Sequence, residues 1–269
     1  MKKLLRVICL LVVSLLALQL FFLLKIALMS VVSPQSTSFQ RSEAWRIVIS
    51  QGELPWRQEW VNYSDMSTGI KQAVIASEDG DFVNHDGVEW DAVESAWNKN
   101  AKAEERALQR AKKLQSKRKN TSTSTSTSTS TSTSTTAVAS KTEKPVKIIG
   151  GSTITQQLAK NLFLSGERNF VRKGQEFVIT EFLELTLSKR QILAIYLNNV
   201  EWGEGVFGAE AAAQHYFRKP AKQLSSFESA RLAVMLPRPK YFENQAGSAY
   251  LASRASSIVA RMPDSELPD

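Results

Sequence analysis

Cysteine and histidine are nearly absent from this 269-residue sequence, which has one cysteine and two histidines. With Cys9 as the single cysteine, neither a disulfide framework nor a cysteine metal site can organise the chain. His85 and His215 do not share a metal-ligand spacing such as His-Glu-x-x-His, so we expect packing and hydrogen-bonding roles for them rather than zinc binding. Stability must then come from a buried apolar core, for which the chain is long enough.

No charged residue occurs between Val7 and Leu24. This stretch is an apolar run that only Ser14 and Gln19 interrupt. As a helix this run would be roughly 27 Å long, close to the thickness of a bilayer core. A cleaved signal peptide is the alternative, but its apolar region is usually shorter and ends in a small-x-small site, which Ala27–Met29 is not. The run therefore predicts an uncleaved transmembrane helix.

Basic residues set the expected orientation of this helix. Lys2, Lys3 and Arg6 precede the run and no comparable cluster follows it directly, which predicts an N-terminus in the cytoplasm and the rest of the chain on the outer side of the membrane. Lys25 is expected to extend its ammonium to the membrane interface. The expected segments are a cytoplasmic N-terminus and anchor at residues 1–32, one domain at 33–262, and a C-terminal tail at 263–269.

The net charge of +8 first suggests a nucleic acid or a membrane surface as partner. Most of the excess lies between Lys99 and Lys119, and an almost pure Thr-Ser alternation follows from Thr121 to Thr136. Such a repeat has no apolar face to bury, so we expect a disordered insert at about 99–146 that interrupts the domain. It is either a tolerated surface loop or a basic tract that lies against anionic headgroups or lipid pyrophosphates. Because the excess positive charge is confined to this insert, it gives no reason to expect a nucleic acid as partner.

The first stretch that suggests chemistry ends a helix. Ile70, Ala73, Val74 and Ser77 follow helical spacing, and the pattern stops at Glu78–Gly80. A carboxylate at a helix end is fixed by packing yet points into open space, which suits catalysis. On its own, an Asp-Glu pair near a helix end is usually just solvated.

A second stretch runs from Gly150 to Lys160, where Thr153 and Gln156 have the spacing of a capping box. Amides at such a helix start favour anions, so a phosphate-bearing ligand could meet amides, hydroxyls and Lys160 along one side. An ordinary helix start, with glycines that serve close packing, is an equal alternative.

The third stretch, Arg168 to Glu176, places cations before a carboxylate at the start of another helix. Glu176 is about 140° around the helix from Val171 and is expected off the core side. This pattern suits a diphosphate site, or simply a charged helix face with pairs along the helix. The expected apolar face is Val171, Val178, Phe182 and Leu185.

Taken together and in order, these stretches resemble glycosyltransferase family 51, the peptidoglycan transglycosylases, over about residues 45 to 262. The bifunctional relatives add a transpeptidase domain; the one Ser-x-x-Lys spacing here, Ser116 to Lys119, lies in the basic tract without the companion motifs. We therefore expect a monofunctional member. The matching signatures are Glu78–Gly87, Gly150–Asn161, Arg172–Glu176 and Ile192–Asn199 with Gly203, and the segment Gly208–Phe217 with Leu236, Pro237 and Pro239 is similar to the family's closing part.

The resemblance implies a mainly α fold, a lysozyme-like helical transglycosylase domain preceded by one N-terminal transmembrane helix. It implies lipid II and the growing lipid-linked glycan strand as substrates at the cytoplasmic (inner) membrane, and cell-division or elongation proteins as partners. Neither a scaffold of the cell-wall machinery with weakened catalysis nor a membrane-bound lytic muramidase, which would cut the same polymer, is excluded. The insert departs from the family, whose members normally join the first two signatures by a shorter segment.

By resemblance, Glu78 is the general base and Glu176 positions the donor pyrophosphate. Lys160, Arg168 and Arg172 would neutralise that pyrophosphate. No cofactor is required, although Mg²⁺ or Mn²⁺ held through Glu176 and the pyrophosphate is compatible with the family. The substrate-binding residues implied are Asp79, Ser152, Thr153, Gln156, Gln157, Lys160, Asn161, Arg168, Arg172 and Lys173.

Overall fold

The computed structural model describes residues 2–90, 152–164 and 170–269, together with short stretches of one or two residues between 94 and 109. The chain divides into two compact units, one made of Met1–Glu89 with Ser152–Asp269 and the other of Trp90–Gly151. Most of the expected insert at 99–146 therefore lies outside the described residues. The candidate site belongs to the first unit.

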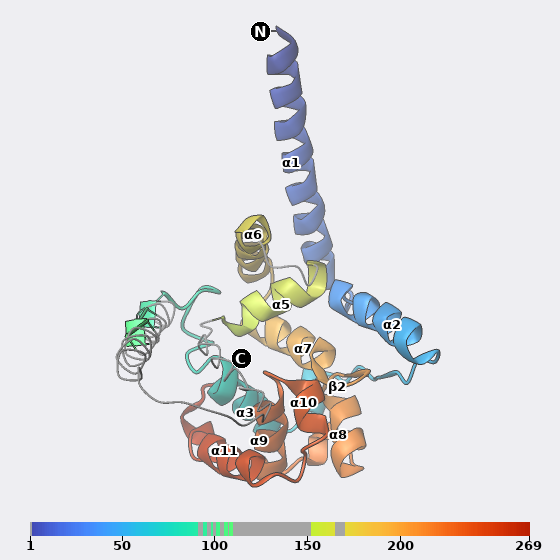
Figure 1. Ribbon diagram of the computed structural model, residues 1–269, viewed down its shortest axis with the longest axis vertical. Coiled ribbons are helices and arrows are strands. Elements are labelled where there is room, and N and C mark those ends of the chain that lie inside the picture. Colours follow the sequence, from blue (N-terminus) through green and yellow to red (C-terminus); the bar gives the residue numbers. More distant parts are fainter. Residues whose placement is uncertain are drawn as a thin grey trace, which may run out of the picture. The chain divides into compact units, whose positions relative to one another are not determined.

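The first unit is built mainly from α-helices, as expected (Figure 1). Its helices are α1 (Lys2–Met29), α2 (Ser38–Gln51), α3 (Thr68–Glu78), α5 (Ile154–Phe163), α6 (Phe170–Thr186), α7 (Lys189–Asn199), α8 (Ala209–Phe217), α9 (Ser226–Met235), α10 (Pro239–Glu243) and α11 (Ala249–Val259). The 3₁₀ turns are η1 (Tyr63–Asp65), η2 (Ala221–Gln223) and η3 (Met262–Asp264).

Helix α1 contains the apolar run and is, in the described part of the chain, the one helix long and apolar enough to cross a membrane. Its C-terminal turns also pack on the domain, because Ile26 is fully buried and the rings of Phe22 and Phe163 meet edge to face at 5.4 Å. The ammonium of Lys25 lies 5.5 Å from the centre of the Phe163 ring. The C-terminal end of α1 is thus packed into the domain core.

A short three-stranded sheet has the order β1-β3-β2 and joins the segment after α2 to the segment after α7. Strand β1 (Arg57–Gln58) runs parallel to β3 (Val206–Phe207), and β2 (Glu201–Gly203) runs antiparallel to β3. Gly205, between β2 and β3, has a φ of +70°, and a Cβ there would lie 2.1 Å from the Pro55 carbonyl oxygen. Only glycine permits this close turn.

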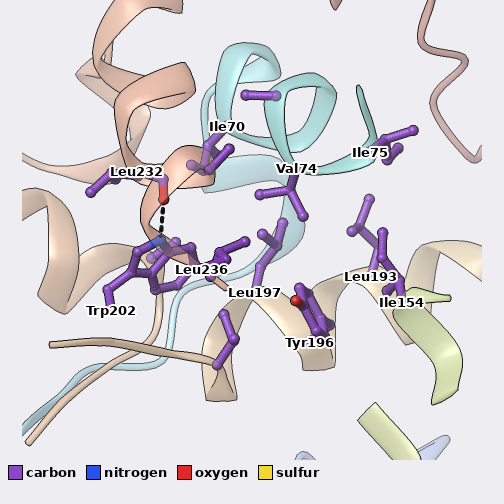
Figure 2. Packing of buried hydrophobic residues seen from close by; sticks show 14 of the residues in the cluster. Ile70, Val74, Ile75, Ile154, Leu193, Tyr196, Leu197, Trp202, Leu232 and Leu236 are labelled. Carbon is purple, nitrogen blue, oxygen red and sulfur yellow. Dashed lines mark hydrogen bonds between the residues drawn. The ribbon is translucent and has the colours of Figure 1, made fainter. Parts of the chain in front are cut away.

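The core lies between α3, α7 and α9, whose buried side chains face one another in Figure 2. The indole nitrogen of the buried Trp202 donates a hydrogen bond to the Leu232 carbonyl oxygen at 3.1 Å. Each fully buried aliphatic side chain contributes about 1.5–3 kcal/mol, so α3 is firmly held up to its last residue, Glu78. The residues labelled in Figure 2 from α3 and α7 are Ile70, Val74, Ile75, Leu193, Tyr196 and Leu197.

Helix α6 is rotated relative to the orientation that the sequence predicts. Val171 and Leu185 are 84% and 80% exposed, whereas Glu176 is only 4% exposed. The predicted apolar face is therefore wrong at Val171 and Leu185, whereas Phe182 packs against the core as expected. Because α6 has apolar residues on more than one side, their spacing alone does not select the inner one. The buried residues of α6 are Glu176, Ile179, Thr180 and Leu183.

Candidate active site

Glu78 occupies the last position of α3, as predicted, with its side chain half-buried. Its Oε2 accepts a hydrogen bond from Gln157 Nε2 at 3.0 Å, and its Oε1 lies 3.3 Å from the Ser77 hydroxyl that donates to it. Burial raises the pKa of Glu78 and the charge of Asp79 adds to this, while the two hydrogen bonds and the charge of Lys160 act in the opposite direction. A carboxylate with a raised pKa is a better proton acceptor near neutral pH.

Gln157 is itself oriented by a buried tyrosine. The hydroxyl of Tyr196 donates to Gln157 Oε1 at 2.9 Å, which leaves the amide nitrogen pointing at Glu78. Tyr196 is 1% exposed, and burial raises its pKa well above the ordinary value, so the hydroxyl keeps its proton. A chain of hydrogen bonds from α7 through α5 therefore fixes the Glu78 carboxylate.

Glu176 is the second acid of the site and lies on α6 among cations. Its Oε2 accepts from Arg172 Nη1 at 3.0 Å and its Oε1 from Lys173 Nζ at 2.5 Å. Glu176 is buried, whereas the Lys173 side chain is 54% exposed. The sequence alternative of ion pairs along the helix is thus present, and it holds two cations at one point where a phosphate could approach from solvent.

Lys160 connects the two acids electrostatically. It lies on α5, and although its side chain reaches solvent, the protein atoms around it lower its pKa. Arg172 and Lys173 lower the pKa further, while Glu176 and Glu78 raise it. The charge of Lys160 therefore interacts with both Glu78 and Glu176.

The positive end of α5 is occupied by the protein's own carboxylate. Asp79 Oδ2 accepts from the Ile154 amide at 2.9 Å, and Asp79 Oδ1 lies 2.8 Å from His85 Nε2. Thr153 and Gln156 form the predicted capping box, which uses further amides of this turn. The ordinary helix start, rather than a phosphate site made of free amides, is thus what the structure contains. Asp79, at 3% exposure, positions other residues.

His85 and Gly87 complete this support. The Gly87 amide donates to His85 Nδ1 at 3.1 Å, so the ring carries its hydrogen on Nε2, where it faces Asp79. Gly87 has a φ of +80°, and a Cβ there would lie 2.7 Å from a Thr180 methyl carbon. His85 is therefore a hydrogen-bonding residue, as expected, and ties the first signature to the second.

The remaining predicted residues are dispersed or not described. Ser152 is exposed and Asn161 is 8% exposed on α5, while Arg168 lies outside the described residues. His215 Nε2 lies 3.3 Å from Glu243 Oε1, in another part of the unit. Among the described residues, no group of three or more His, Cys, Asp or Glu side chains could hold a metal ion.

Two functional contacts escape the sequence patterns. Tyr196 lies in the Ile192–Asn199 signature, which is mostly apolar. A buried tyrosine hydroxyl usually needs a hydrogen-bond partner, and that is the signal available. Gln19 interrupts the apolar run and meets Gln175 of α6, where its amide exchanges hydrogen bonds of 2.9 and 3.0 Å. A polar residue inside a membrane span is a comparable signal.

Comparisons with known proteins agree on one family. The family model described as Transglycosylase matches residues 48–111 and 127–263. A biosynthetic peptidoglycan transglycosylase of Burkholderia thailandensis is 48% identical over 253 residues, which cover 94% of this chain and 83% of that protein. Proteins of the same name are 47% identical over 253 residues in Burkholderia pseudomallei (94% and 83% covered) and 45% over 254 residues in Paraburkholderia phytofirmans (94% and 89% covered).

Proposed function

The chain belongs to the transglycosylase family, and from that membership we infer that it is a peptidoglycan glycosyltransferase that polymerises glycan strands for cell-wall synthesis. The single observation that carries this inference is the near full-length similarity to biosynthetic peptidoglycan transglycosylases. The two acids and the cations of the family signatures are all present among the described residues except Arg168.

The donor in this proposal is lipid II or the growing lipid-linked strand, and the transfer inverts the anomeric carbon. The acceptor 4-hydroxyl oxygen attacks that carbon, the bond from carbon to the phosphate oxygen breaks, and the polyprenyl pyrophosphate leaves with the bonding electrons. The hydroxyl proton goes to Glu78. The raised pKa of Glu78 and its fixed hydrogen bonds support this role.

Glu176 has a different task, because a pyrophosphate is a weak base and leaves without protonation by a second acid, unlike the leaving group of an inverting glycosidase. We place Arg172, Lys173 and Lys160 around the pyrophosphate, with Glu176 holding the first two in position. Cations located where negative charge develops are a leading catalytic contribution.

The described residues do not form a preassembled site for Mg²⁺ or Mn²⁺. Glu176 is a lone carboxylate here, and both of its oxygens already bind cationic side chains. Such an ion would have to be held mainly by the pyrophosphate oxygens. No step of the proposed reaction is routed through it.

Helix α1 supports a single-pass location in the cytoplasmic membrane. The basic residues before it support an N-terminus in the cytoplasm and a catalytic domain in the periplasm, where lipid-linked donors are polymerised. The membrane and the lipid-linked glycans are the partners that this proposal requires. Cell-division or elongation proteins remain family-based expectations.

The test is polymerisation of a labelled lipid-linked disaccharide-pentapeptide by the purified full chain in phospholipid vesicles, with Glu78→Gln as the matched control. We expect long glycan from the wild type and almost none from the variant. Equal polymer from both would remove Glu78 as the base. No polymer from either, with folded protein, would favour the scaffold function, and clearing of preformed cell wall without donor would favour the muramidase.

A further inference from the structure

The membrane helix and the helix that carries Glu176 are joined by a pair of glutamines. Gln19 Nε2 donates to Gln175 Oε1 at 2.9 Å, and Gln175 Nε2 donates back to Gln19 Oε1 at 3.0 Å. The two residues are 156 positions apart in sequence. Gln175 immediately precedes Glu176 on α6, so this pair reaches the candidate site directly.

An anchor alone does not need this pair. A leucine at position 19 would insert into a membrane more favourably than glutamine, whose amide needs partners in an apolar environment. Gln19 lies six residues before Lys25, about 9 Å along the helix axis, and so inside the apolar span. Both amides satisfy one another there. Ser14, the other polar interruption, is exposed.

The contacts of α1 lead to the cationic half of the site. Helix α1 contacts α6, which lies beside its lower half in Figure 1. The contacts of Phe22 and Lys25 with Phe163 reach the C-terminal end of α5, the helix that carries Lys160. Glu78, by contrast, is held by Gln157 and by the packing of α3 on α9.

We propose that Gln19 and Gln175 form a positioning pair, through which the membrane helix fixes Glu176 and its cations relative to the bilayer surface. The inference rests on the proposed function, since a lipid-linked donor carries its pyrophosphate at that surface. Neither glutamine touches the reacting atoms. They act through the placement of α6, because a rigid helix transmits the position of Gln175 to its neighbour Glu176.

The first experiment measures polymerisation from the labelled lipid-linked donor by the full chain in vesicles of phosphatidylethanolamine and phosphatidylglycerol. The variants are Gln19→Leu, Gln175→Leu and the double variant, with Ser14→Leu as a matched polar-to-apolar control on the same helix. We expect each single variant to lose about 3- to 20-fold in kcat/KM, the range of interhelical hydrogen bonds in membranes. The control should keep wild-type activity.

The double variant should be no worse than the worse single variant, because losing either amide already breaks the pair. Losses that multiply would mean that the glutamines act independently and would overturn the proposal. An active wild type with an equally active Gln19→Leu would overturn it too. An inactive wild type, by contrast, would count against the proposed function itself.

A second measurement separates positioning from general stability. Donor affinity is measured with Gln19→Leu added to Glu78→Gln and, separately, to Glu176→Gln. We expect the full 3- to 20-fold weakening in the first background and little further weakening in the second, where the positioned carboxylate is already lost. Equal weakening in both backgrounds would show a merely structural role. Unfolding midpoints are compared for all variants.

Discussion

Glu78 and Glu176 are chemically identical side chains in opposite surroundings. Glu78 is held by neutral hydrogen bonds from Gln157 and Ser77, and burial raises its pKa. Glu176 is more deeply buried but has a cation on each oxygen. Burial makes the first carboxylate a good proton acceptor, whereas the second is engaged in ion pairs with Arg172 and Lys173.

The difference shows that surroundings, rather than residue type, divide the work between paired acids. Lys160 responds to both carboxylates, so the two regions form one site with a proton-accepting end and a charge-holding end. Substitutions at Glu78 and at Glu176 should therefore affect different kinetic constants.

The largest effect is expected at the proton-accepting end. Glu78→Gln keeps the shape and the Gln157 neighbourhood but cannot take a proton, so kcat should fall by about 10² to 10⁴. Donor affinity should stay within a few-fold of wild type. Single-turnover polymerisation and donor binding check this, and a Glu78→Gln enzyme that turns over normally would contradict the division of roles.

The next effect is expected at the charge-holding end. Glu176→Gln removes the ion pairs with Arg172 and Lys173, and a hydrogen bond to a charged group is worth about 1.5–3 kcal/mol, so we expect a 10- to 100-fold loss in kcat/KM. Part of it should appear as a higher KM for the donor. If kcat alone fell, and by as much as in Glu78→Gln, the two carboxylates would not differ as proposed.

A smaller effect should follow from Tyr196→Phe, which removes the hydroxyl that orients Gln157. One neutral buried hydrogen bond is worth about 1 kcal/mol, so kcat should fall about fivefold. Because the Gln157 hydrogen bond lowers the pKa of Glu78, its loss should move the acidic limb of the pH–rate profile to higher pH. Tyr63→Phe is the control, since the Tyr63 hydroxyl has no hydrogen-bond partner among the described residues. An unmoved limb would show that Tyr196 only packs.

A buried carboxylate outside the site, Glu201, provides a further comparison. Glu201 is 6% exposed, and burial raises its pKa to about 7, with further raising by Glu43 and Glu204 and opposition from Lys240. Its Oε1 lies 3.4 Å from Lys240 Nζ. Unlike Glu78, it belongs to a network of ion pairs between α2, β2 and α10.

Glu201→Gln should change stability and leave polymerisation unaltered, which tests whether a raised pKa alone makes a base. The folded protein holds this proton up to about pH 7, whereas the unfolded chain loses it near 4.5, so the wild type loses stability as pH rises between these values. The variant lacks that loss and should be more stable by about 1–3 kcal/mol at pH 8 and little changed at pH 4. Thermal unfolding at the two pH values measures this. A large loss of activity would contradict it.

Local rules predicted the parts of the site that are set within one helix. The end of α3 at Glu78 and the cap at Thr153 follow from spacing over a few residues, and both are confirmed. The rotation of α6 could not be predicted, because it depends on which of its apolar sides meets the core. The hydrogen bond from the first amide of α5 to Asp79 could likewise not be predicted, because Asp79 and Ile154 are 75 residues apart in the sequence.

The same limit applies to Tyr196 and Gln175. Each is an ordinary polar residue in its own helix, and each gains a role only from a partner supplied by another helix. Sequence spacing identifies the ionisable residues of the site, whereas the neutral side chains that orient them require the tertiary arrangement. The resemblance to a family identified the signatures and their order. The structure adds the contacts that hold the signature residues in position.

The contacts that bracket residues 90–151 bear on how this protein tolerates evolutionary change. The Thr153 hydroxyl donates to the Gly87 carbonyl oxygen at 2.6 Å, so the first unit closes on itself on both sides of that segment. Each doubling of such a connection costs only about 0.6 kcal/mol in loop entropy. Length variation at this point is therefore cheap for natural lineages, and the same point is a practical place to insert a fluorescent reporter for following the enzyme in living cells.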